Sequence, residues 1–215
     1  MMLAFIYAAL VVAGAVSMHA AFAMPQEYAA PDIAHFARYR TSLQWGSFLE
    51  LASAMPFGIF VAAVVSRLRF LGVRAAGELI ALCGGIVAMV MLIVSALAVW
   101  GLSSPSVTGA AGAVSVFQLL SFGAGGPGFV ATLGLFVAGV SVAAGLHRFI
   151  PRWLMWLGIF VAVASELSTL MLLVWNAAYF IPVGRFISII WMIGVAATLP
   201  ISIPSNQDLA ISPAD

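Results

Sequence analysis

Charge is what this chain of 215 residues has least of, because only 7% of its residues are charged and none of them is lysine. A soluble domain carries about 25% charged residues, so this composition does not provide a surface for water. Eight arginines and a net charge of +1 exclude a basic surface for nucleic acid and a polybasic lipid-binding tail. The single cysteine, Cys83, excludes an intrachain disulfide and a cysteine-cluster metal site.

Apolar side chains are in excess: they make up 64% of the residues and must face lipid. A bilayer core needs about 20 apolar residues for each spanning helix. We therefore predict an all-α integral membrane helical bundle, with residues 1–204 as a single domain and residues 205–215 as a disordered cytoplasmic tail. The six predicted spans cover about 3–23, 47–66, 77–101, 127–147, 153–178 and 182–203.

Two of the connecting segments carry features of their own. Residues 24–46 form a polar loop, and Pro31-Asp32 favours the start of a short amphipathic helix that lies on the outer membrane surface. Between spans three and four, glycine, serine and proline at 101–112 predict a break in the helix. For the segment 114–128 that follows, an interfacial turn of helix and a re-entrant piece both fit the pattern.

The arginines predict the orientation of the spans. Arg67, Arg69 and Arg74 lie between spans two and three, and Arg148 and Arg152 lie between spans four and five. If these five face the cytoplasm, the other three fall on the outer side. The positive-inside rule then predicts that both termini are cytoplasmic.

The first span has some features of a signal peptide. Residues 3–16 form an apolar core, and Ala21-Phe22-Ala23 resembles a cleavage site. No basic residue precedes the core, however, so we expect a retained span.

Glu166 is the sharpest single feature, because it lies near the middle of the fifth span. An ionised, unpaired acid there costs about 2.5–3.5 kcal/mol. Helical spacing places small and polar residues on one face, which we expect to turn inward with the carboxyl of Glu166 beside Ser165 or Thr169. The site is either a proton-binding or ligand-binding carboxylate, or a structural acid that bonds neighbouring helices. That face comprises Gly158, Ala162, Ser165, Glu166 and Thr169.

Two other acids have predicted partners. Glu50 and Arg185 each lie about one turn inside the outer boundary, and an ion pair between them would lower the desolvation cost of both. A clamp between helices and a substrate site both fit this pair. Glu78 begins the third span and is predicted to interact with the helix dipole.

The histidines do not form a convincing metal site. His19 lies near the outer end of the first span, where it could bond across helices or approach Glu50. Asp32 and His35 share a spacing of three residues, but a metal needs further ligands. His147 is predicted to mark a cytoplasmic helix end.

Gly123-Ala-Gly-Gly-Pro-Gly128 matches the pattern of a dinucleotide-binding loop, but it lacks the strand–helix–strand context that the mechanism needs. We interpret it as a tight start of span four, with further glycines allowing close packing. With no Ser-His-Asp set and no paired cysteines either, we predict no catalytic residue, no metal ligand and no cofactor.

The C-terminal half resembles a family of uncharacterised bacterial multi-pass membrane proteins, known only as a domain of unknown function. The resemblance covers residues 118–200 and implies a bacterial helical membrane protein with no assigned activity. It rests on residues 118–129, 151–158, 164–169 and 182–186 together with Trp191, of which Pro-Arg-Trp-Leu at 151–154 and Pro-Val-Gly-Arg-Phe at 182–186 are the most distinctive.

Three classes of function remain open. An accessory or scaffold protein would act through helix contacts with a membrane partner or with itself, and needs no chemistry. A small proton-coupled transporter would use Glu166, with Glu50 and Arg185 along a polar path. A membrane-embedded enzyme would need a cluster of acids and histidines at an interface. Site content favours the first class, in the bacterial cytoplasmic (inner) membrane.

Overall fold

The computed structural model describes residues 1–19, 33–73 and 76–200, and all regular secondary structure in these residues is helical. Five helices are long and apolar enough to cross a membrane, and a shorter apolar helix precedes them. The predicted all-α membrane bundle is therefore confirmed. The elements are α1 (Met2–Met18), α2 (Ile33–Arg38), α3 (Arg40–Phe70), α4 (Ala76–Leu102), α5 (Pro105–Thr108), α6 (Ala111–Gly123), η1 (Ala124–Gly128), α7 (Phe129–Leu146), α8 (Arg152–Leu167), η2 (Ser168–Leu172), η3 (Trp175–Tyr179) and α9 (Phe180–Thr198).

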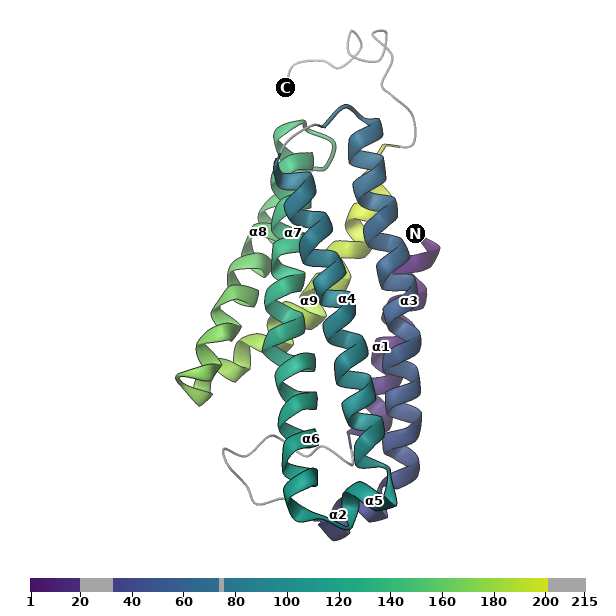
Figure 1. The fold of residues 1–215 in the computed structure, drawn as a ribbon. Coiled ribbons are helices and arrows are strands. Elements are labelled where there is room, and N and C mark those ends of the chain that lie inside the picture. Colours follow the sequence, from purple (N-terminus) through teal and green to yellow (C-terminus); the bar gives the residue numbers. More distant parts are fainter. Residues whose placement is uncertain (20–32, 74–75, 201–215) are drawn as a thin grey trace, which may run out of the picture.

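The long helices pack in sequence around one core. Figure 1 shows α3, α4 and α7 side by side, with α1 on the far side of α3 and the α8–α9 pair beside α7. The core is rich in aromatic rings, and the ring of Phe136 lies edge-on to those of Phe57, Phe60 and Trp191. Such edge-to-face pairs add about 0.5–1.5 kcal/mol each beyond the area they bury.

Arginine is concentrated at one end of the bundle, which we call the arginine-rich end and define by Arg67, Arg69, Arg148 and Arg152. The other end carries α2 and α5, and we call it the α2–α5 end (Figure 1). The N-terminus of α1 and the C-terminus of α9 both point toward the arginine-rich end, where the guanidinium of Arg67 donates to the carbonyl of Pro200 at 2.6 Å.

The segment between α1 and α3 differs from the expected amphipathic helix. Its helix α2 has only six residues, and α3 already begins at Arg40, seven residues before the predicted span. Phe36 and Leu43 are buried, and together with Val114 they form a second, small core at the α2–α5 end. Burial of these apolar side chains holds the segment against α4 and α6. The N-terminal part of the predicted loop lies outside the described residues.

Helix α6 is continuous in direction with α7, so segment 114–128 is neither a re-entrant piece nor an interfacial turn (Figure 1). The two helices meet at η1, a single π-helical turn. Gly126 has φ −89° and ψ −106°, outside the helical region, and Pro127 has no N–H to donate. The glycine-rich motif is therefore a break inside one long helix rather than the start of a span.

Glycine allows α4 and α7 to approach closely. A Cβ on Gly84 would lie 2.7 Å from the backbone nitrogen of Phe136 and 2.8 Å from the carbonyl oxygen of Thr132. Gly139 of α7 meets the backbone of Gly77 and Ala81 in the same way. The predicted use of glycine for close packing along this span is borne out by these contacts.

Candidate functional site

A polar cluster lies inside the apolar bundle beside the break between α6 and α7. It brings together side chains from α3, α4 and α9, which are far apart in the sequence. Each member faces inward because of its register: Glu50 and Ser95 are buried within α3 and α4, and Arg185 is mostly buried on the first turns of α9. We call Glu50, Ser95, Gly125 and Arg185 the break cluster.

The ion pair predicted between Glu50 and Arg185 is present. A guanidinium nitrogen of Arg185 donates to Oε1 of Glu50 at 3.4 Å, and 5% of the Glu50 side chain and 22% of the Arg185 side chain are exposed. Ser95 donates to the same carboxylate oxygen at 3.1 Å. Two donors on a buried carboxylate offset part of the desolvation penalty that an unpaired acid would carry.

The broken helix supplies the other half of the cluster. A second nitrogen of Arg185 donates to the carbonyl oxygen of Gly125 at 3.2 Å, and the hydroxyl of Ser95 also lies 3.2 Å from the carbonyl oxygen of Ser121. A π turn that contains a proline loosens the regular carbonyl ladder, and such backbone is tolerated at membrane depth only where protein groups satisfy it. Arg185 and Ser95 fulfil that role here.

Two aromatic residues complete the surroundings. The guanidinium carbon of Arg185 lies 5.3 Å from the centre of the Phe129 ring, within the range of a cation–π contact. Tyr7 of α1 is fully buried, lies within electrostatic range of both charges, and its hydroxyl has no hydrogen-bond partner in the structure. Tyr7 therefore brings α1 close to the break cluster without a hydrogen bond to it.

The break cluster is an ion pair between α3 and α9 with further hydrogen bonds to α4 and η1. Positive and negative charges neutralise each other, and each polar group of the break cluster is engaged with another element. The ion pair joins α3 to α9, as a clamp between helices would. A substrate would have to displace Glu50 or Gly125 from Arg185.

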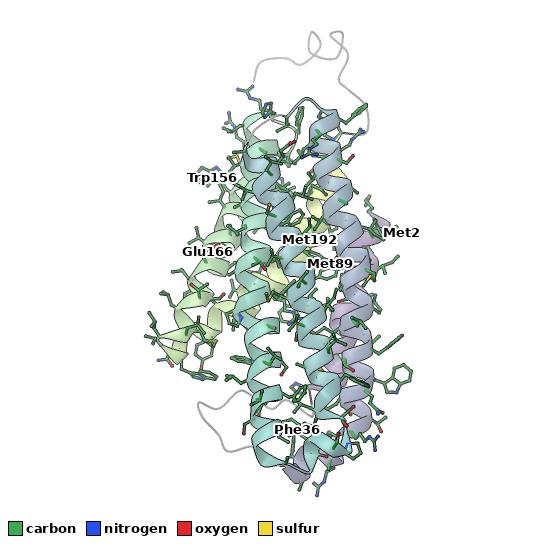
Figure 2. All side chains as sticks on the ribbon, viewed as in Figure 1. Met2, Phe36, Met89, Trp156, Glu166 and Met192 are labelled. Carbon is green, nitrogen blue, oxygen red and sulfur yellow. The ribbon has the colours of Figure 1, made fainter. Side chains whose placement is uncertain are left out.

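The expected inward orientation of Glu166 is wrong. Its side chain is exposed on α8, and Figure 2 places it at the outer edge of the bundle, whereas Ser165 next to it is fully buried. Neighbouring residues of a helix differ by about 100° in direction. Ser165 faces Gly134 of α7 and Gly184 of α9, so Glu166 is turned away from them.

The other residues of the predicted face divide between inside and outside. Gly158 and Ala162 are buried as expected, and Thr169 is partly exposed, with its hydroxyl on the backbone carbonyl of Glu166 rather than on the carboxyl. His19 is exposed at the end of α1, whereas Glu50 is buried, so the structure does not place His19 in the break cluster.

At the arginine-rich end, Glu78 and His147 lie at the ends of helices. Glu78 lies in the first turn of α4, as predicted, and also accepts from the guanidinium of Arg69 at 2.9 Å. His147 caps α7 and its ring lies 2.9 Å from the carbonyl of Ala143. Within the described part of the chain, no group of three or more His, Cys, Asp or Glu side chains gathers to hold a metal ion.

Three members of the site were not predicted from the sequence. In the sequence, Tyr7 has the pattern of an interfacial aromatic residue. Gly125 belongs to the glycine-rich motif that we interpreted as a tight start of span four. Ser95 carried a usable signal, since it is the one hydroxyl residue of the 27-residue helix α4. A lone serine deep in an apolar span has to find an acceptor, and that rule would have directed attention to it.

The comparisons with known proteins add no further assignment. No family model matches the chain, and no curated protein and no solved structure matches it either.

Proposed function

We propose that this chain is an accessory or scaffold protein that binds a neighbouring membrane protein through one face of α8 and η2. We call it the Glu166 face and define it by Trp156, Phe160, Val163, Glu166 and Leu170, all of which are exposed. The observation that carries the proposal is the position of Glu166, a carboxyl group on an otherwise apolar surface inside a membrane-spanning helix.

The depth of Glu166 makes exposure to lipid unfavourable. It lies 14 residues beyond Arg152, or about 21 Å along the helix axis, and after Ser168 and Thr169 an apolar run continues from Leu170 to Val174. An acid at such a position costs about 2.5–3.5 kcal/mol on insertion scales. A partner that covers the carboxyl and donates to it removes that cost.

The chemistry of the partner follows from what this chain lacks. Within the described helices, Arg185 is the one basic residue deep in a span, and it is already bound to Glu50 and Gly125. A second copy therefore brings no free cation to Glu166. The best complement is a transmembrane helix from another protein that carries a lysine or arginine at matching depth.

The location is part of the same proposal. The resemblance over residues 118–200 supports a bacterial cytoplasmic membrane. The excess of arginine at the arginine-rich end supports a cytoplasmic position for that end and for both termini.

The test is site-specific photocrosslinking in native membranes, with benzoylphenylalanine in place of Val163. Ile59 of α3 is the matched control, because 57% of it is exposed compared with 54% of Val163. We expect a crosslinked protein from the first site only, attached within a transmembrane segment that contains a basic residue. Glu166→Leu should abolish the crosslink, and Glu166→Lys should regain it when the basic residue of the partner is changed to Glu.

Two results would contradict the proposal. One is equal crosslinking from Val163 and Ile59. The other is a crosslink that persists unchanged in Glu166→Leu, because the carboxyl would then contribute nothing. Crosslinking of two copies of this chain would replace the hetero-partner with self-association.

A transporter is the second candidate, and the break cluster favours it. Transporters often bind their substrates where a helix is interrupted near the middle of the membrane, beside buried charges. Reconstituted protein should then carry a solute or protons across vesicles, and Arg185→Met should abolish the flux while Glu166→Leu leaves it intact. Absence of any flux would contradict the transporter, and a flux that Arg185→Met leaves unchanged would contradict a transport role of the break cluster.

A further inference from the structure

An open groove lies on the surface between α3 and α4. It has a volume of about 440 Å³ and lies toward the α2–α5 end. Its lining is mostly apolar, and more than half of the Phe48 and Trp100 side chains is exposed. The groove is lined by Gln44, Ser47, Phe48, Leu51, Ala96, Leu97 and Trp100.

An arginine stands in line with this groove. Counted from Arg40, residues Gln44, Ser47, Phe48 and Leu51 follow at helical spacings of 4, 7, 8 and 11, so all of them share one stripe of α3. Arg40 is exposed and begins α3, at the end of the helix. The stripe therefore runs from a charged residue at the end of α3 to apolar residues farther along the helix.

Trp100 indicates the depth of the groove. Tryptophan side chains favour the boundary between headgroups and acyl chains, and Trp45 lies beside the same stripe. From Gln44 to Leu51 the groove extends about 10 Å along the axis of α3 into the hydrocarbon region. These dimensions suit the first part of an acyl chain rather than a folded polypeptide.

We propose that this groove binds one acyl chain of an anionic phospholipid, with the phosphate of the headgroup beside Arg40 and the amide of Gln44. The charge complementarity fixes the class of lipid, because a basic residue at the membrane surface attracts anionic headgroups by about 1 kcal/mol. The site lies away from the Glu166 face and does not depend on the proposed function.

The experiment uses the full chain in vesicles of nine parts phosphatidylcholine and one part phosphatidylglycerol that carries a photoreactive diazirine in its acyl chain. Labelled residues are mapped by mass spectrometry. Phe48 and Leu97 are 58% and 50% exposed, and Ile59 on α3 and Ile86 on α4 are matched exposed controls outside the groove at 57% and 52%. We expect stronger labelling at Phe48 and Leu97, and competition by unlabelled phosphatidylglycerol but not by phosphatidylcholine.

Two variants separate a bound lipid from bulk lipid. Arg40→Gln should lower groove labelling about fivefold, which corresponds to about 1 kcal/mol. Arg38→Gln is the control, since Arg38 is exposed at the same end but belongs to α2. Leu97→Phe should fill the groove and lower labelling at Phe48, whereas Ile59→Phe should not.

Three outcomes would overturn the proposal. The first is equal labelling of groove and control residues. The second is the same effect of Arg40→Gln and Arg38→Gln. The third is a crosslink, with benzoylphenylalanine at Leu97 in native membranes, to another polypeptide instead of lipid, because a protein would then occupy the groove.

Discussion

Loss of Arg185 from its buried ion pair with Glu50 should destabilise the bundle more than loss of Arg69 from its shorter ion pair with Glu78. At 3.4 Å, the attraction between the unit charges of Glu50 and Arg185 is about 5 kcal/mol for an effective dielectric constant of about 20. Breaking a buried pair by removing one partner costs about 3–5 kcal/mol, because the other charge stays buried without compensation. Since 22% of the Arg185 side chain reaches the surface, we expect about 3 kcal/mol for Arg185→Met.

The measurement is a double-mutant cycle. The free energy of unfolding of each variant is determined by SDS titration in mixed micelles. Glu50→Gln removes the negative charge and keeps an oxygen that can accept from Ser95. The double variant Glu50→Gln/Arg185→Met should be more stable than Arg185→Met alone, because it leaves no buried charge. The two single effects should therefore not add.

The control is the pair of Arg69 and Glu78. Its distance is 2.9 Å, shorter than that of the buried pair, and 51% of the Arg69 side chain but only 10% of the Glu78 side chain is exposed. Water reaches the arginine side of this pair, and Gln at position 69 keeps an N–H donor for Glu78, so Arg69→Gln should cost less than Arg185→Met, about 0–1 kcal/mol. If Arg69→Gln cost as much as Arg185→Met, or if the cycle were additive, the reasoning that burial decides the magnitude would be refuted.

Three further predictions concern packing, the break and topology. Gly84→Ala should lower the unfolding free energy by about 1–3 kcal/mol, because the new methyl group meets the backbone of Thr132 and Phe136, while Gly112→Ala, with nothing within 4 Å, should be neutral or slightly stabilising; thermal unfolding in detergent distinguishes them. Ser95→Ala should cost about 0.5–1.5 kcal/mol in the same assay, because the acceptors on Glu50 and Ser121 each lose one of two donors, whereas Ser106→Ala at an exposed site should have no effect, and equal effects would contradict the role of Ser95. In a Cys83→Ser background, cysteines at positions 106 and 148 should react with an impermeant reagent from opposite sides of the membrane. Reaction of both cysteines from the same side would contradict the predicted topology.

The membrane is why the fold was predictable. Lipid leaves few solutions for an apolar chain, so the apolar runs and the scattered arginines were sufficient to predict an all-α membrane bundle. The pairing of Glu50 with Arg185 was predictable for the same reason, since two charges at similar depth on different spans have few alternatives to each other. The prediction needed no knowledge of how the helices pack.

Two features were beyond the reach of the sequence pattern. Helical spacing places Ser165 and Glu166 about 100° apart, and only the actual packing of α7 and α9 decides which of them lies inside. The assumption that a polar residue turns inward failed because a small side chain was needed against Gly134 and Gly184. The glycines around Pro127 were interpreted as a turn, although carbonyl acceptors satisfied by Arg185 and Ser95 allow a helix to continue past them.

The wide separation of Glu50 and Arg185 in the sequence has a consequence for biosynthesis. They are 135 residues apart, so at about 5–20 residues per second a ribosome needs about 7–27 s to make the second partner after the first. During that interval Glu50 of α3 lies in the membrane with Ser95 as a hydrogen-bond donor but without Arg185. The carbonyl oxygen of Gly125 in η1 also lacks its guanidinium donor. A nascent chain that stalls before α9 therefore presents an uncompensated acid and a loosened helix inside the bilayer. Arrival of α9 completes the break cluster, because Arg185 then binds both Glu50 and Gly125.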